Sequence, residues 1–184
     1  DPHGLRRYRP QIIDRWINGM NCNDVLRSIR YTLSLSEQKI CDIINAAGVG
    51  TTPAQVASWL LAEDEAGYAE CDDAALSAFL DGVIVLRRGA REAKPGQAAS
   101  SAPVSTRLNN NLVLKKLRIA FELKEEDLLE IFALAQFRIS RPEVTALFRA
   151  PGHQNYRVCG DQILRNFLKG LAARVRRPKD SKGA

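Results

Sequence analysis

The chain of 184 residues contains one sequence twice, at a constant offset of 88 residues and without a gap. Asn23 and Asn111 open the two copies, and Gly82 and Gly170 lie near their ends. Residues shared at this offset include Leu26/Leu114, Arg30/Arg118, Glu37/Glu125, Val56/Val144, Tyr68/Tyr156, Cys71/Cys159, Asp73/Asp161 and Phe79/Phe167. An ungapped match of this extent indicates that one folded unit was duplicated with its loop lengths intact.

Each copy has the apolar spacing of four helices. In the first helix of the first copy, Leu26, Ile29 and Leu33 follow one another at i, i+3 and i+7. The same spacing recurs at the matching positions of the second copy, and no strand-like alternation competes with it. The sequence therefore predicts an all-α protein of two homologous four-helix copies in tandem, either stacked or related by a pseudo-twofold axis.

The repeat also divides the chain into segments. We expect an N-terminal extension at 1–19, a first copy at 20–88, a flexible linker at 89–107, a second copy at 108–174 and a disordered basic tail at 175–184. The linker is expected because this stretch is small, polar and contains two prolines. Met20 is the only methionine and the extension has no counterpart in the second copy, so we expect the native chain to start at Met20.

The two copies carry opposite charge. From Met20 to Ala90 there are five basic and ten acidic residues, whereas from Leu108 to Arg174 there are eleven basic and seven acidic residues. The net charge of +6 for the whole chain hides this asymmetry. Charge separation of this kind bears on partners more than on fold.

Local signals place helix starts and one close contact. Thr52 with Gln55, and Ser140 with Glu143, have the spacing of capping boxes, so the third helix of each copy is expected to begin there. A glycine within the fourth helix costs about 1 kcal/mol relative to alanine. Because both copies keep it, we expect a close backbone crossing, with helix four lying against helix one or against the other copy.

Repeated polar residues predict two structural ion pairs. Arg30 and Arg118 lie on or beside the apolar face of the first helix, where a guanidinium needs a carboxylate partner. We predict that Arg30 pairs with Asp73 and that Arg118 pairs with Asp161. A pair of anion-binding sites is the alternative.

Signals for catalysis are weak. The histidines are His3 and His153, and no nucleophile–base pairing, glycine-rich phosphate loop or metal-ligand spacing accompanies them. Cys71 and Cys159 precede the fourth helices, where a thiol could become reactive, but no base accompanies either, so we expect buried, inert cysteines. We therefore expect no enzyme, no metal and no cofactor. No apolar run is long enough to span a membrane, and free thiols favour the cytoplasm.

Helices two and three of each copy have the outline of a DNA-binding helix-turn-helix. The acidic run Glu63-Asp64-Glu65 in the first copy would repel phosphate, so only the second copy suits nucleic acid. Its candidate contacts with nucleic acid or another anion are Lys115, Lys116, Arg138, Arg141 and Arg149.

The segments 23–31, 63–68, 109–121 and 159–165 resemble the YehS-like family of uncharacterised bacterial cytoplasmic proteins, which carry a domain of unknown function in tandem. The resemblance covers about residues 20–174. It implies a bacterial source and a start at Met20, but it carries over no activity, substrate or site residue.

The leading hypothesis is a non-enzymatic module for protein interaction or regulation, in which the acidic and basic copies offer different surfaces to a partner or to each other. The alternative is DNA or RNA binding through the second copy.

Overall fold

The computed structural model describes residues 20–89 and 107–178, and this part of the chain forms eight helices and no strand. The first copy contains α2 (Cys22–Leu33), α3 (Glu37–Ala46), α4 (Pro53–Leu60) and α5 (Asp73–Arg88). The second contains α6 (Asn110–Ala120), α7 (Glu125–Leu134), α8 (Arg141–Leu147) and α9 (Asp161–Val175). The all-α fold with two four-helix copies is confirmed. The predicted N-terminal extension and nearly all of the predicted linker lie outside the described residues.

Side chains at the helix starts explain where several helices begin. Ser140 and Glu143 form the predicted capping box at the start of α8. At α4 the prediction was half right, because Thr52 accepts a hydrogen bond from the backbone N–H of Gln55 but Gln55 does not return one. The side-chain oxygen of Gln55 instead accepts a hydrogen bond from the hydroxyl of Thr51 at 3.0 Å. Both third helices therefore start at the predicted residue.

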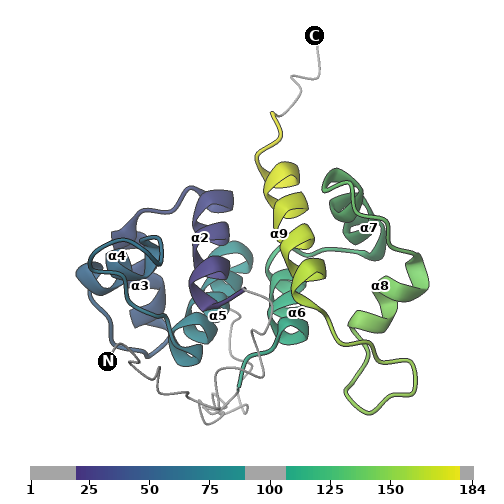
Figure 1. The fold of residues 1–184 in the computed structure, drawn as a ribbon, viewed down its shortest axis with the longest axis horizontal. Helices are drawn as coiled ribbons and strands as arrows, with labels where there is room; N and C mark the ends of the chain where they lie inside the picture. Colours follow the sequence, from purple (N-terminus) through teal and green to yellow (C-terminus); the bar gives the residue numbers. More distant parts are fainter. Residues whose placement is uncertain (1–19, 90–106, 179–184) are drawn as a thin grey trace, which may run out of the picture.

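The two copies meet through their first and fourth helices. Helix α5 packs on α6, and α2 packs on α9, so the same pair of elements meets twice with the copies exchanged. Figure 1 shows these four helices in the middle of the molecule, with α3 and α4 on one side and α7 and α8 on the other. The sequence left two arrangements open, stacked copies or copies related by a pseudo-twofold axis, and the structure has the pseudo-twofold one. It buries one continuous apolar core drawn from both copies.

Polar contacts join the central helices of the two copies along their length and at their ends. Lys116 of α6 forms an ion pair with Asp81 of α5, and Arg88 at the end of α5 lies 3.4 Å from Glu122. Arg176 occupies the matching position after α9, where it donates to the carbonyl of Tyr31 and the hydroxyl of Ser34. The predicted disordered tail is therefore wrong for its first residues, because α9 runs to Val175 and Arg176 contacts the first copy.

The repeated glycines mark the closest helix crossing in each copy. A Cβ atom on Gly170 would lie 1.8 Å from the carbonyl oxygen of Ile131, and one on Gly82 would lie 2.3 Å from the side chain of Ile43. The close crossing is therefore confirmed, but its predicted partner was wrong. At these glycines helix four crosses helix two of its own copy, and its packing on the first helix of the other copy is a separate contact.

Asn23 and Asn111, the residues that open the repeat, form the same hydrogen-bonded clamp. The side chain of Asn23 donates to the carbonyls of Trp59 and Ala69, at 3.0 and 2.8 Å, and accepts from the backbone N–H of Cys71 at 3.0 Å. Asn111 makes the three equivalent bonds. Each clamp joins helix one to the end of helix three and to the segment that precedes helix four.

The glycine crossing predicts a graded loss of stability. Alanine at Gly170 must push the backbone of α7 away, so we expect Gly170→Ala to lower the free energy of unfolding by about 3 kcal/mol. Gly82→Ala should cost less, because its first clash is with a side chain that can move. Urea unfolding followed by circular dichroism measures both. Gly50→Ala, where a Cβ meets nothing within 4 Å, is the control. Equal midpoints for the three variants would contradict the crossing.

The asparagine clamp predicts a second difference between the copies. Asn23→Ala leaves an N–H and two carbonyls without their partner in a site where the side chain is 1% exposed, so we expect a loss of about 3 kcal/mol. Asn111→Ala should cost less, because its side chain is only partly buried and water can replace some of the bonds. The same unfolding measurement applies, with the exposed Asn155→Ala as control.

Candidate functional site

The predicted ion pairs of Arg30 and Arg118 are wrong. Arg30 Nε donates to the carbonyl of Leu35 at 3.2 Å, and Arg118 Nε donates to the carbonyl of Leu123 at 3.1 Å. The backbone N–H of each leucine donates back to the carbonyl of the same arginine, at 3.0 Å in both copies. Each arginine therefore closes the turn between helix one and helix two, where the preceding residue has a positive φ of 53° or 52°.

Distance explains why the predicted partners do not meet. Asp73 accepts from the thiol of Cys22 at 3.5 Å and from the backbone N–H of Leu108 at 3.2 Å. Asp161 accepts from the side chain of Asn110 at 2.8 Å. Both carboxylates thus lie beside the start of a first helix, whereas Arg30 lies eight residues along α2, about 12 Å away along the helix axis. These aspartates join helix four to helix one at the opposite end from the arginines.

The five candidate contacts with nucleic acid do not form one basic surface. Lys116 is paired with Asp81 at the junction of the copies. Arg141 lies 3.3 Å from Glu125 and 3.6 Å from Glu126, so its charge is neutralised by α7. Lys115 is exposed on α6.

Arg138 and Arg149 flank α8 at its two ends. Helix α8 has seven residues, so its ends are about 10 Å apart. Arg149 lies in a hollow of about 260 Å³ with Arg118, Glu125 and Phe148, and the guanidinium of Arg118 stacks 4.6 Å from the centre of the Phe148 ring. The exposed start of α8 also carries Glu143, which disfavours a phosphate backbone beside it.

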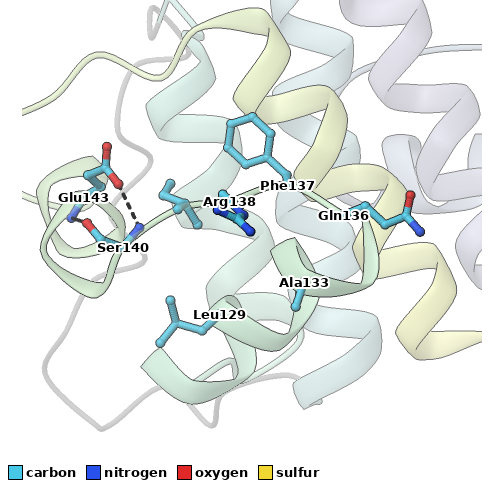
Figure 2. A pocket seen from close by; sticks show the side chains of 8 residues that line it. Leu129, Ala133, Gln136, Phe137, Arg138, Ser140 and Glu143 are labelled. Carbon is cyan, nitrogen blue, oxygen red and sulfur yellow. Dashed lines mark hydrogen bonds between the residues drawn. The ribbon is translucent and has the colours of Figure 1, made fainter.

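Arg138 belongs instead to a shallow apolar groove between α7 and the segment that leads into α8. The groove has a volume of about 710 Å³ and is lined by Leu129, Ala133, Gln136, Phe137, Arg138, Ile139, Ser140 and Glu143. Figure 2 shows Leu129 and Ala133 along α7, Phe137 opposite them, and Arg138 between. This is the candidate functional site, and we call it the α7–α8 groove.

Local backbone geometry forms the groove. Gln136 adopts a φ of 56°, which ends α7 and turns the chain back along the helix. The backbone N–H of Phe137 then donates to the carbonyl of Phe132 at 2.9 Å, and the two rings pack with centres 5.7 Å apart. Because Phe137 is anchored in this way, the next two residues are held beside α7 and form one wall of the groove.

The same place in the first copy is closed by polar side chains. Positions 41, 45 and 51 correspond to Leu129, Ala133 and Ile139 in the repeat. They hold a cysteine, an asparagine and a threonine, and Asn45 exchanges hydrogen bonds with the backbone of Thr51, at 2.8 and 3.2 Å, and donates to the sulfur of Cys41 at 3.3 Å. The second copy therefore has an apolar surface where the first copy has a hydrogen-bonded network.

The groove has two charged side chains, and only Glu143 already has partners within the described residues. Glu143 accepts from the backbone N–H of Ser140 at 2.8 Å and pairs with Arg157 at 3.0 Å. The Ser140 bond, and then the Arg157 cation, hold the pKa of Glu143 below its ordinary value. Arg138 makes no hydrogen bond or ion pair with the residues that the structure describes. The cation that the groove offers to a ligand is thus Arg138.

The repeated cysteines are buried, as expected for inert thiols. Cys71 and Cys159 are 6% and 2% exposed. Burial raises the pKa of the Cys71 thiol well above its usual range, and burial together with the nearby Asp161 raises the pKa of Cys159 to about 12. Such thiols stay protonated at neutral pH.

Neither a metal centre nor a membrane-spanning helix is found within residues 20–89 and 107–178. No group of three or more histidine, cysteine or acidic side chains there is placed to hold a metal ion. No helix there is long and apolar enough to cross a membrane.

Known proteins identify the family of this chain. Residues 22–89 and 110–177 each match the family described as protein of unknown function DUF1456. The uncharacterized protein YehS of Escherichia coli (strain K12) is 50% identical over 155 residues, which are 84% of this chain and 96% of that relative. No solved structure matches significantly. The chain therefore belongs to the DUF1456 family, in two tandem copies, and the resemblance found in the sequence is confirmed.

Sequence reasoning missed the apolar part of the groove. The sequence analysis does not single out Leu129 or Ile139, although a position-by-position comparison of the copies shows that they replace Cys41 and Thr51. That comparison, applied to differences instead of identities, is the signal that could have found the groove.

Thiol burial predicts slow chemistry and a pH effect. We expect the four cysteines, all buried, to resist Ellman's reagent in the native chain and to react after unfolding in urea. Burial raises the pKa of the Cys159 thiol to about 12 in the folded chain, whereas an unfolded thiol titrates at about 8.5. The folded state therefore keeps its full stability below pH ~8.5, where the thiol is protonated in both states. It loses stability as the pH rises toward 12, because the unfolded thiol then ionises and the buried one does not. Rapid native labelling would contradict the burial.

Proposed function

We propose that this chain is a protein-interaction module whose α7–α8 groove binds a short apolar segment of a partner protein, with a carboxylate of the partner on Arg138. The single observation that carries the proposal is the exchange of the Cys41–Asn45–Thr51 network for an open apolar surface in the second copy. The fold itself does not require this exchange, because the first copy folds with the polar set.

The size and lining of the groove suit a few anchoring side chains. Its volume of about 710 Å³ falls within the range of ligand sites, and one buried leucine or phenylalanine contributes about 1.5–3 kcal/mol. Two or three such anchors, after the cost of association, give a transient complex and not a permanent one. An amphipathic helix that inserts one apolar edge is the segment that best fits a groove of this kind.

Charge selects the chemistry of the segment. Glu143 is already bonded to Ser140 and Arg157, whereas Arg138 is exposed and unpaired among the described residues. A guanidinium in this position can donate two parallel hydrogen bonds to a carboxylate. We therefore expect the partner to place an aspartate or glutamate among its apolar anchors.

The state of the other basic residues favours a protein partner over nucleic acid. Lys116 and Arg141 are neutralised within the fold, and Arg138 and Arg149 lie at opposite ends of α8. A duplex would need several free cations along one surface. Binding of duplex DNA is therefore the competing outcome of the test of this proposal.

Selection from a phage library of short random peptides on the full chain tests the proposal. Ala133 is exposed in the groove wall, so Ala133→Arg fills the groove without disturbing the core, and Arg138→Glu reverses its charge. We expect selected peptides to combine apolar residues with an acidic one. Each variant should weaken their binding about tenfold or more, a loss of about 1.4 kcal/mol, in fluorescence anisotropy. Lys39→Glu, on the exposed side of α3, is the charge control and should bind as the parent does.

Two results would overturn the proposal. One is a set of peptides that binds the Ala133→Arg chain as well as the parent. The other is salt-sensitive binding of random duplex DNA that both Arg138→Glu and Arg149→Glu abolish while no peptide is selected. That second result would assign the function to nucleic acid.

A further inference from the structure

A second cavity lies at the junction of the two copies, between α2 and α9. It has a volume of about 300 Å³ and is lined by Met20, Asp24 and Ser28 from the first copy and by Arg165, Leu168 and Lys169 from the second. Met20 and Leu168 are each 3% exposed, so the floor of the cavity is part of the core. Arg165 and Lys169 are one helical turn apart and therefore share a face of α9.

The cations of this cavity have no partner within residues 20–89 and 107–178. Neither Arg165 nor Lys169 makes an ion pair or hydrogen bond through its side chain there, and the hydroxyl of Ser28 is also uncommitted. The carboxylate of Asp24 is engaged elsewhere, with Arg27 at 2.6 Å and with the backbone N–H of Asn21 at 2.9 Å. Two like charges thus lie one helical turn apart on α9, and the carboxylate in the cavity wall, that of Asp24, is already paired with Arg27.

The other junction of the same molecule shows how these positions can be filled. Between α5 and α6, the repeat places Asp81 where α9 has Lys169 and places Lys116 where α2 has Ser28. These two residues form an ion pair. Leu112 stands in place of Asp24, and Ser77 in place of Arg165. At one junction the two charges therefore pair with each other, whereas its pseudo-symmetric counterpart has two cations and a hydroxyl without a partner among the described residues, beside a carboxylate that Arg27 already occupies.

We propose that the cavity between α2 and α9 binds the phosphate group of a small soluble molecule. Arg165 supplies a planar fork that suits phosphate oxygens, Lys169 supplies a point charge, and Ser28 supplies a hydroxyl donor from the facing helix. The volume is at the lower end of small-molecule sites. Asp24 in the wall disfavours a polyanion, so the ligand class is a single phosphate ester and not a nucleic-acid backbone. Because the ligand touches both copies, it stabilises their junction.

The test uses the full chain and inorganic phosphate as the probe. Two-dimensional ¹H–¹⁵N NMR follows a phosphate titration at constant ionic strength, set with sodium chloride. We expect saturable shifts of the amides of Ser28, Leu168 and Lys169. The variant Ser28→Lys/Lys169→Asp copies the ion pair of the other junction, and we expect it to bind phosphate at least tenfold more weakly. Lys39→Ala changes the net charge by the same single unit on the exposed side of α3 and should bind as the parent does.

Arg165→Ser provides an independent variant, because its side chain is exposed and its loss leaves the core intact. It should weaken phosphate binding in the same sense even where the paired variant fails to fold. Absence of saturable shifts in the parent chain would overturn the proposal. So would shifts that persist in Arg165→Ser, which would place the anion elsewhere. Co-sedimentation with vesicles of phosphatidylcholine and phosphatidic acid, without shifts by inorganic phosphate, would assign the cations to a membrane and also overturn it.

Discussion

The close contact between helix four and helix two sets the geometry of each copy. The backbone of helix four lies directly against Ile43 at Gly82 and against Ile131 at Gly170. Helix four therefore packs closer to α3 or α7 than any residue with a Cβ atom would allow. One face of helix four is used in this way, and its remaining apolar face is left for the first helix of the other copy. The central layer of α2, α5, α6 and α9 follows from that division of surfaces. The asparagine clamps and the arginine-closed turns then hold the connecting segments around the same frame.

On this shared frame the two copies differ where they meet solvent. The turn between helices two and three is polar and internally bonded in the first copy, through Asn45 and Thr51, and apolar in the second. The two junctions differ as well, since Lys116 and Asp81 pair at one of them and Arg165 and Lys169 stand unpaired, among the described residues, at the other. Both candidate sites are therefore departures from the repeat. Neither could be found among the residues that the copies share.

The sequence carried more information about the fold than about the sites. Helical spacing that recurs at a fixed offset predicted every helix pair, and the glycines predicted a close crossing. The partner in that crossing was mistaken, because periodicity gives the buried face of a helix but not its neighbour. Arg30 was predicted to pair with a carboxylate, but it hydrogen bonds to the turn at the end of its own helix. The spacing of residues in the sequence does not reveal such a contact with a backbone carbonyl. The groove depends on how residues 136–139 fold back on α7, and a positive φ at Gln136 is not visible in the residue type.

The pseudo-twofold junction has a consequence for stoichiometry. Contacts of α5 with α6 and of α2 with α9 are those that two identical single-copy chains would make in an isologous dimer. Such a dimer would present every surface twice, and no surface could change without its twin changing too. Joining the two halves in one chain removes that constraint. Each molecule then displays one apolar groove and one cationic junction, so the two proposed ligands would each bind once per molecule, whereas a symmetric dimer would present each such site twice.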